Sequence, residues 1–520
     1  MSKRTILLWA ACAFVLLASG CGGGRASRPL PPSPSPSAAG RTPSVPSVSV
    51  RKLADFRYDI NLFNDMFLQH PVQPLGRDGA AWLEPSVSGT GAERKAAVRL
   101  VVEEAGKRKV LFEGDGNNWH LRSTPDGSLL SWLSWRGEGE EEHCVLVGTP
   151  ASGEGEAEVK AVFPAGGVVL DYFWYDSRYL YALMVFDEDL RDVRLLACDT
   201  EKGERRELIS TGGFPHLMER DTLGIPGRLA WSPGSGIGYF SACGALFAFQ
   251  GATGEGGLFL DGGDLMFLTS PSVSADGRFL SFYAVPPGGY AFVNCEMEVE
   301  SGRFCCYTDR RLPADKAAAD FLFTRHNVFT AGGHADIIGV GNGVVSVERP
   351  GGPERLLLKV EKDAMSLVEA PEGFIVVTPR SLVRYRIAGG AGGFPTARWS
   401  APKVRAARFP DFRTPEGTLR TYLAAFQRGA PQVWTVCHRE DGPAKWVASV
   451  GPAVAARSLR MLGALRNYRR FKAVMAGGDK VVYEGELEVC GDLIGKDVFT
   501  LARLGGMWLL ESIRPAEEMK

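Results

Sequence analysis

Tight turns recur along residues 51–402 at nearly constant spacing, and this repeat constrains the fold more than any other feature of the chain. Each turn precedes a run of apolar residues, as Asp126-Gly127 precedes Ser-Leu-Leu-Ser-Trp132. The other turns are Asp78-Gly79, Asp176-Ser177, Gly234-Ser235, Asp276-Gly277, His326-Asn327 and Glu372-Gly373. Successive turns begin 48, 50, 58, 42, 50 and 46 residues apart. A repeat of this length with several short strands predicts a mainly β protein, a β-propeller of four-stranded blades.

The seven turns predict about seven blades, with six and eight kept as alternatives. A single blade cannot bury both of its faces, so the blades must stack around an axis and the last must close on the first. The 63 glycines sit in short turn clusters, which favours many strands over long helices. A pair of sandwiches or a generic antiparallel domain is the competing fold.

Two of the repeats carry a known blade motif. The segments Ser123-Thr-Pro-Asp-Gly-Ser-Leu-Leu-Ser-Trp132 and Ser272-Val-Ser-Ala-Asp-Gly-Arg-Phe-Leu-Ser-Phe282 resemble the Ser-Pro-Asp-Gly-(Lys/Arg)-x-(Ile/Leu)-(Ala/Ser)-Phe motif of TolB-like and WD-type propellers. Trp231-Ser-Pro-Gly234 keeps the front half of that motif. The resemblance implies a rigid propeller whose loops present a binding face.

Residues 1–21 are typical of an export signal, with Met1-Ser-Lys-Arg4, an apolar run over 5–17 and small residues before Cys21. The segment Leu17-Ala-Ser-Gly-Cys21 resembles the lipobox of bacterial lipoproteins, with Ala18 where that family most often has leucine. The resemblance implies cleavage before Cys21 and a diacylglyceryl group on its thiol. We therefore expect a lipoprotein at the outer face of the cell membrane, or at the outer membrane of a Gram-negative source. An ordinary signal peptide with an incidental cysteine is the alternative.

A segment rich in Gly, Arg, Ser and Pro follows the signal over residues 22–50. Such a composition cannot bury apolar surface, so we expect a disordered, partly polyproline tether. The predicted organisation is therefore a signal over 1–21, a tether over 22–50, a propeller over 51–402 and a separate domain over 405–520.

Several classes of function lack their usual signals. The net charge of −1 provides no excess of positive charge that would attract nucleic acid. None of the seven histidines is paired at metal-ligand spacing, and CxxC, Gly-x-Ser-x-Gly and phosphate-binding glycine motifs do not occur. The sequence thus predicts a non-enzymatic protein without metal or cofactor. Carboxylate pairs for glycoside cleavage stay open, because their members would come from different blades.

Five cysteines are candidates for disulfide bonds in an exported protein. Cys295 can meet Cys305 or Cys306 if residues 294–306 form a hairpin, and Cys437 and Cys490 are the two cysteines of the last hundred residues. The alternative for each pair is a set of buried thiols that act as small hydrophobic side chains.

After residue 403 the repeated turn-and-strand pattern gives way to helical spacing followed by strands. This order over residues 405–520 predicts an α+β domain. Thr414, Pro415 and Glu416 are typical of a helix start, and Gly429 of a helix end. Leu419, Tyr422, Leu423 and Phe426 fall on one face of that helix. A second helix is expected near 454–465, followed by strands over 468–475, 481–490, 498–504 and 508–513.

The segments Thr414-Pro-Glu-Gly-Thr-Leu-Arg-Thr-Tyr-Leu-Ala-Ala-Phe426 and Phe499-Thr-Leu-Ala-Arg-Leu-Gly-Gly-Met-Trp-Leu-Leu-Glu-Ser-Ile513 are similar to the first helix and last hairpin of nuclear-transport-factor-2-like cone domains. The resemblance implies a curved sheet that wraps helices into a cone with a cavity. Because such a domain has its own core, we expect removal of residues 405–520 to leave a folded propeller.

Three basic residues, Arg466, Arg469 and Arg470, form the one local charge bias that suggests a site. They share a face only if the second helix continues through them, and an anionic envelope polymer or lipid headgroup could bind there. The alternative is a solvated helix end favoured by the helix dipole.

These observations predict a monomeric, membrane-anchored cell-envelope lipoprotein that binds or scaffolds an envelope protein or polymer. The competing functions are a hydrolase acting on peptide or glycan, with its site in the propeller channel or the cone cavity, and a sensor of a small ligand.

Overall fold

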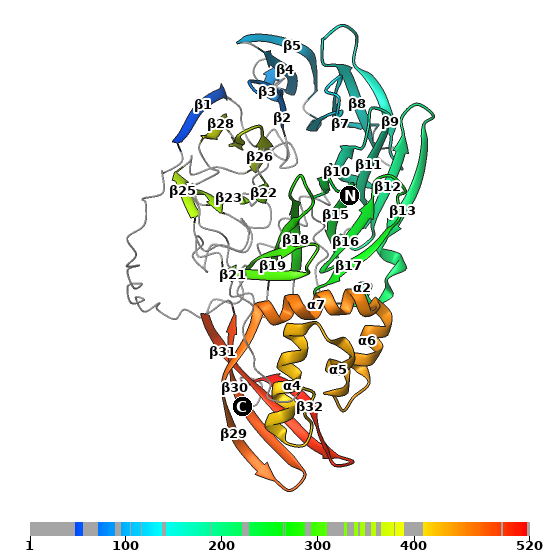
Figure 1. Ribbon diagram of the computed structural model, residues 1–520. Helices are drawn as coiled ribbons and strands as arrows, with labels where there is room; N and C mark the ends of the chain where they lie inside the picture. The colour runs from blue at the N-terminus through cyan, green and yellow to red at the C-terminus, as the bar shows by residue number, and fades with distance from the viewer. Residues whose placement is uncertain are drawn as a thin grey trace.

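The computed structural model describes residues 47–55, 71–88, 95–308, 327–388 and 409–516, with internal gaps at 105, 116, 138–141, 188, 221–227, 264, 266, 286–292, 330–336, 342–343, 349–354, 360–365, 379 and 490–491. The predicted signal and the tether up to residue 46 lie outside these residues. Figure 1 shows two parts, a set of sheets above and a smaller α+β part below.

Seven four-stranded antiparallel sheets form the larger part, which confirms the predicted mainly β propeller with seven blades in the described residues. The first four blades are β2 (Val72–Leu75), β3 (Gly79–Ser88), β4 (Lys95–Glu104), β5 (Lys107–Asp115); β6 (Asn118–Ser123), β7 (Leu129–Arg136), β8 (His143–Pro150), β9 (Glu158–Val162); β10 (Val168–Trp174), β11 (Tyr179–Val185), β12 (Val193–Asp199), β13 (Glu204–Ser210); and β14 (Ala230–Ser232), β15 (Ile237–Ala242), β16 (Ala245–Gln250), β17 (Gly256–Asp261). The remaining three are β18 (Phe267–Val273), β19 (Phe279–Val285), β20 (Val293–Glu298), β21 (Arg303–Thr308); β22 (Asn327–Phe329), β23 (Ile337–Gly341), β24 (Val344–Glu348), β25 (Arg355–Lys359); and β26 (Ser366–Ala370), β27 (Gly373–Val377), β28 (Ser381–Ala388) with β1 (Ser47–Asp55).

The N-terminal strand closes the ring. β1 pairs antiparallel with β28, from Ser47 opposite Ala388 to Asp55 opposite Ser381, and the order of this sheet is β1-β28-β27-β26. The first described residues therefore supply the outer strand of the last blade (Figure 1). The predicted tether boundary at residue 50 is wrong by four residues, because Ser47–Val50 already belong to β1.

Six of the seven repeated turns join the first and second strands of a blade. In the second blade Asp126 Oδ1 accepts hydrogen bonds from Thr124 Oγ1 at 2.5 Å and from the Ser128 amide at 3.1 Å. Gly127 completes the turn at φ 71°, a conformation that favours glycine. The exception is His326-Asn327, because Asn327 already belongs to β22 and His326 lies outside the described residues.

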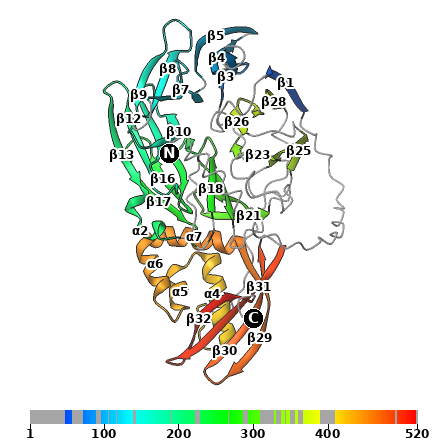
Figure 2. The same ribbon diagram turned by 180° about the vertical axis from the view of Figure 1, so that it is seen from behind.

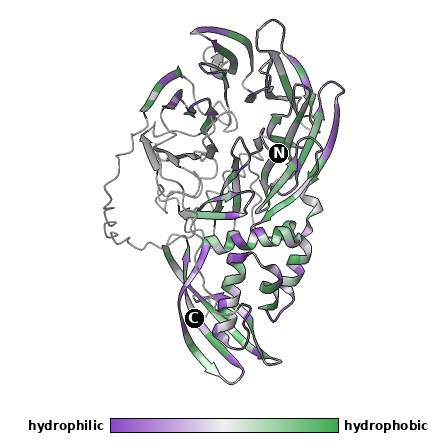
Figure 3. Cartoon of the chain, viewed as in Figure 1, coloured by the Kyte–Doolittle hydropathy of each residue, from purple (hydrophilic) through white to green (hydrophobic). Residues whose placement is uncertain are grey.

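The first strand of each blade lies at the centre of the propeller. The first strands of neighbouring blades contact one another along the series β10, β6, β2, β26, β22, β18 and β14. The outermost strands β5 and β13 are largely exposed, whereas β10 and β11 are largely buried. Figure 3 colours much of β5 and β13 as hydrophilic. Side chains of the first strands are therefore the ones that can line a central channel.

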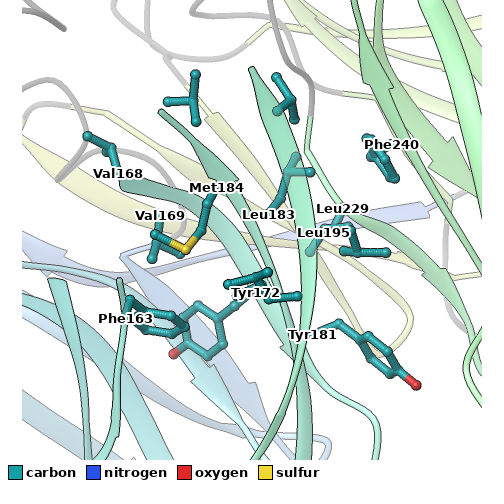
Figure 4. Packing of buried hydrophobic residues seen from close by; sticks show 14 of the residues in the cluster. Phe163, Val168, Val169, Tyr172, Tyr181, Leu183, Met184, Leu195, Leu229 and Phe240 are labelled. Carbon is teal, nitrogen blue, oxygen red and sulfur yellow. The ribbon is translucent and has the colours of Figure 1, made fainter. Parts of the chain in front are cut away.

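Apolar side chains fill the spaces between blades. The largest cluster joins the second, third and fourth blades and includes Phe163, Tyr172, Met184 and Phe240, all buried (Figure 4). Burying a large apolar side chain contributes about 1.5–3 kcal/mol. When blades stack, these apolar side chains therefore contact the neighbouring blade instead of the solvent that they would face in an isolated blade.

In the described residues from 409 onward, four helices and one sheet form the C-terminal part. They are α4 (Pro415–Arg428), α5 (Pro431–Val436), α6 (Gly442–Val450), α7 (Pro452–Leu465), β29 (Arg466–Gly477), β30 (Lys480–Val489), β31 (Asp492–Leu504) and β32 (Met507–Pro515). α4 begins where predicted, since Thr414 Oγ1 accepts from the Gly417 amide at 3.0 Å, and it ends at Gly429 with φ 59°. The predicted second helix and four strands are also confirmed, whereas α5 and α6 were not predicted.

α7 lies between the propeller and the C-terminal sheet in both Figure 1 and Figure 2. Its buried Met461 and Leu465 share one apolar cluster with Leu246, Leu260 and Leu280 of the propeller. The two parts therefore share a hydrophobic core at their junction. No helix among the residues that the structure describes has the length and apolarity needed to cross a membrane.

Candidate functional site in the propeller channel

A cavity of about 420 Å³ lies where the first strands of six blades converge. Its lining residues are Gln73, Pro74, Arg122, Phe173, Arg228, Leu229, Ala230, Trp231, Pro271, Ser272, Val273, Leu367, Val368, Glu369, Ala370 and Pro371. They belong to or adjoin β2, β6, β10, β14, β18 and β26. We refer to this cavity as the channel site. Its charged members are Arg122, Arg228 and Glu369.

A buried carboxylate organises one wall of the channel site. Asp171, which is 1 % exposed, lies with Oδ1 2.6 Å from His120 Nε2 and 3.0 Å from Arg122 Nη2. Its Oδ1 also accepts from the Tyr172 amide at 2.7 Å, and its Oδ2 from the Leu229 amide at 3.0 Å. Asp171 thus ties the first strands of three blades together.

Two backbone irregularities place these groups. The pairing of β6 with β7 shifts between Trp119 and Arg122, and His120 within that bulge has φ 65°. The pairing of β10 with β11 shifts between Val169 and Asp171. Bulges re-aim side chains, and a non-glycine residue at positive φ stores strain that is common at functional sites. Here the two bulges bring His120 and Asp171 into contact.

The charge states of this wall follow from burial and pairing. Burial alone would raise the pKa of Asp171, but Arg122 and His120 more than offset it and hold that pKa below its usual range. Burial lowers the pKa of His120, only partly opposed by Asp171. We therefore assign an ionised Asp171, a neutral His120 that donates Nε2–H to it, and a charged Arg122.

Arg228 is the second arginine of the channel site. Burial lowers the pKa of Arg228 to about 9, so this side chain stays protonated near neutral pH. Arg228 and Arg122 both line the cavity, and one buried carboxylate stands near the pair. Two cations near one carboxylate leave this wall positive, which suits an anionic group of a ligand.

Glu369 on β26 adds a titratable group. Its side chain is accessible from the channel, yet protein surrounds it, and this desolvation raises its pKa to about 7. A carboxyl group with such a pKa can exchange protons near neutral pH. Within the described residues no group of three or more His, Cys, Asp or Glu side chains could hold a metal ion.

The sequence analysis did not single out any of the charged channel residues or Asp171. A usable signal was present, because Asp171 interrupts the otherwise apolar strand Val168–Trp174. A buried charge is costly unless it is paired, so an aspartate in such a strand indicates a partner elsewhere. That partner, Arg122, directly precedes the blade motif that begins at Ser123.

The structure describes four of the five cysteines that were predicted as candidates for disulfide bonds. Cys295 lies opposite Cys306 in the β20–β21 pair, with the two Sγ atoms 3.3 Å apart, whereas Cys305 lies opposite Glu296. Cys437 is buried, and it is a free thiol in the part of the chain that the structure describes. Cys21 and Cys490 lie outside the described residues. Both disulfide bonds and the lipidation at Cys21 stay predictions.

The three basic residues do not share a helical face. α7 ends at Leu465, so Arg466, Arg469 and Arg470 begin strand β29. Arg469 forms an ion pair with Glu488, and Arg470 lies 3.9 Å from Glu486. These carboxylates offset the positive charge on which the predicted anion patch depends, and binding of an anion there stays a prediction.

No family model and no curated relative matches the chain. Among solved structures it is similar to TolB from Acinetobacter baumannii, at 14% identity and a TM-score of 0.36 over 60% of this chain and 66% of that one. It is also similar to an oligogalacturonate lyase in complex with manganese, at 11% identity and a TM-score of 0.41 over 61% and 98%. The β-propeller domain of the Trilobed protease from Pyrococcus furiosus is similar at 12% identity and a TM-score of 0.38 over 59% and 90%.

These similarities concern the fold alone, and the chain spans just under two thirds of the length of TolB. Because the identities and TM-scores are low, the propeller architecture rests on the seven sheets described above.

Proposed function

We propose that this protein is an exported envelope lipoprotein, anchored through Cys21, whose propeller binds an anionic segment of an envelope protein or polymer without catalysing a reaction. The observation that carries the binding role is the channel site, where buried Asp171 orients Arg122 beside Arg228. A rigid propeller presents such groups with little loss of entropy on binding. The proposal further includes a monomeric protein and a C-terminal domain of the nuclear-transport-factor-2-like type.

The two channel arginines supply the binding test. Replacing both Arg122 and Arg228 with glutamine should weaken binding of acidic peptides or acidic oligosaccharides by at least tenfold, because each charge-assisted hydrogen bond contributes about 1.5–3 kcal/mol. Fluorescence polarisation with labelled ligands measures the dissociation constants. Arg99→Gln is the matched control, since Arg99 on β4 pairs with Glu113 on β5 and both side chains are exposed to solvent. Equal affinities of wild type and the double variant would refute the channel as the binding site.

A hydrolase remains the second candidate, and Glu369 is the observation that favours it. A carboxyl group with a pKa of about 7 can serve as a general acid or base in a solvent-accessible channel. The same ligands should therefore be assayed for turnover by the purified protein. Turnover that disappears in Glu369→Gln would replace the non-enzymatic proposal with the enzymatic one.

The anchor is tested by Cys21→Ser in the full chain. This variant should move from the membrane fraction to the soluble fraction after cell lysis, because a serine cannot carry the thioether-linked lipid. Cys12→Ser is the matched control, since Cys12 lies in the apolar part of the signal and should leave anchoring intact. Retention of Cys21→Ser in the membrane fraction would contradict the lipobox interpretation.

A further inference from the structure

A second cavity, of about 260 Å³, lies where the C-terminal domain meets the propeller. Among the described residues the propeller contributes Gly263 to its lining. Aromatic rings dominate the rest of the lining, which includes Tyr422, Phe426, Trp434, Trp446 and Tyr468. We call it the junction cavity. Its volume is near the lower end of small-molecule sites, which are about 300–1,000 Å³, and suits one or two fused rings.

Edge-to-face packing fixes the orientation of these rings. The centroids of Trp434 and Trp446 are 5.5 Å apart at 73°, and those of Phe426 and Trp434 are 5.9 Å apart at 69°. Tyr422 meets Phe426 at 4.9 Å and 84°. Rings held in this way form a preorganised apolar wall that favours a planar aromatic guest.

One residue of the lining carries a polar group that has no partner among the described residues. The indole Nε1–H of Trp434 is buried and has no hydrogen-bond acceptor among the described residues. By contrast, the Nε1–H of Trp446 donates to Asp261 Oδ2 at 2.8 Å. An unpaired buried donor is costly, so a ligand that brings an acceptor to Trp434 would recover a hydrogen bond.

The charges around the cavity offset one another. Arg466 lines it, and Tyr468 donates to Asp497 Oδ2 at 2.6 Å. Burial chiefly raises the pKa of Tyr468, which Asp497 raises further and Arg466 lowers, so both charges lie near the same hydroxyl. A cation beside an anion gives no net charge to attract an ionic ligand.

The walls of the cavity couple the two parts of the chain. Fully buried Asp261, at the end of β17, accepts from Trp446 and from Arg220 Nη2 at 2.7 Å. Its amide donates to Ser458 Oγ on α7 at 2.9 Å, and Gly263 follows two residues later. A guest in the cavity would therefore contact groups that hold α6 and α7 against the propeller.

We propose that the junction cavity binds an uncharged planar bicyclic aromatic molecule whose hydrogen-bond acceptor pairs with Trp434 Nε1–H, and that this ligand strengthens the contact between the C-terminal domain and the propeller. The proposal is independent of the channel site. It assigns Trp434 to ligand selection and Asp261 to the coupling.

Quinoline and naphthalene form a matched pair of test ligands, because they share a shape and only quinoline carries an acceptor. At pH 7.5 quinoline should bind the full chain saturably and on the order of tenfold more tightly than naphthalene, as one hydrogen bond predicts. Quenching of tryptophan fluorescence and isothermal titration calorimetry measure both constants. Absence of saturable binding by either compound would overturn the proposal.

Trp434→Phe keeps an aromatic ring at this position and removes the Nε1–H donor. It should therefore bring the ratio of the affinities for quinoline and naphthalene close to one. Trp119→Phe is the matched control, because the Trp119 indole N–H is also buried without an acceptor but lies in the propeller. Leu462→Phe adds a ring to the cavity wall and should abolish binding while thermal unfolding stays cooperative. An unchanged preference in Trp434→Phe, or unchanged binding in Leu462→Phe, would contradict the assigned site.

Hydrogen exchange tests the coupling. Saturating quinoline should slow exchange of the Asp261 amide, which donates across the junction to Ser458. Unchanged exchange of this amide at saturation would overturn the coupling even if the ligand binds.

Discussion

Asp171→Asn should lower the free energy of unfolding by about 3–5 kcal/mol, the range for breaking a buried ion pair on one side. The substitution keeps the shape of the side chain but removes the buried charge that pairs with partly buried Arg122 and accepts from His120. The amide nitrogen would also face donors where a carboxylate oxygen now accepts from Tyr172 or Leu229. Chemical denaturation of the full chain measures the change.

Asp192→Asn is the matched control for this loss. Asp192 pairs with Arg194 in a partly exposed position, where an ion pair contributes about 1 kcal/mol or less. A loss in Asp171→Asn no larger than that in Asp192→Asn would show that Asp171 does not organise the wall of the channel.

The effect of Asp171 should also depend on pH. Its pKa is lowered in the folded protein, so the stabilisation is fully present above the unfolded pKa of about 3.9. It is lost as pH falls below that value toward the folded pKa. The difference in stability between wild type and Asp171→Asn should therefore be constant near neutral pH and shrink below about pH 4. A difference that grows on acidification would contradict the assigned charge state.

Local chemistry explains why the sequence predicted the blades. The turn at Asp276-Gly277 repeats the hydrogen bonds of Asp126-Gly127, with Ser274 Oγ donating to Asp276 Oδ1 at 2.7 Å and Gly277 at φ 75°. Each such turn is complete within a few residues, so its sequence is sufficient to identify it. The repeat therefore located the hairpin between the first two strands in six blades.

Distant pairing explains what the sequence did not predict. β1 forms its hydrogen bonds with β28, which lies more than 300 residues away in the chain. The sequence of Ser47–Asp55 alone does not indicate that it pairs with this strand. The channel site likewise combines Arg122, Asp171, Arg228 and Glu369 from four different first strands or their flanks. Only closure of the ring brings these side chains together, and local patterns carry no information on it.

At the junction between the propeller and the C-terminal domain, the sequence likewise predicted a local element but not its distant contacts. The apolar spacing of residues 454–465 predicted an amphipathic helix, and α7 confirms it. The spacing did not reveal that Met461 and Leu465 also belong to an apolar cluster with residues of the propeller. The expectation that the propeller folds without residues 405–520 stays a prediction, and truncation would remove Met461 and Leu465 from the cluster that they share with Leu260.

Met461→Ala should accordingly lower the free energy of unfolding by about 2–5 kcal/mol, because it leaves a cavity in the core that the two parts share. Since α7 packs on both parts, we expect the propeller and the C-terminal domain to lose stability together in one cooperative transition. Calorimetry of the full chain, with tryptophan fluorescence as a second signal, measures the midpoints. Met475→Ala is the matched control, because Met475 on β29 is 53 % exposed and should change stability by less than about 0.5 kcal/mol.

The outcome separates two kinds of architecture. If calorimetry resolves two transitions and Met461→Ala lowers only one of them, the C-terminal domain is an independent unit and truncation should spare the propeller. If both signals shift together, the hydrophobic contact of α7 with the propeller, and the hydrogen bonds of Asp261 to Trp446 and Ser458, join the two parts into one cooperative unit. We expect the second result, because a shared buried cluster cannot be opened on one side without exposing the other.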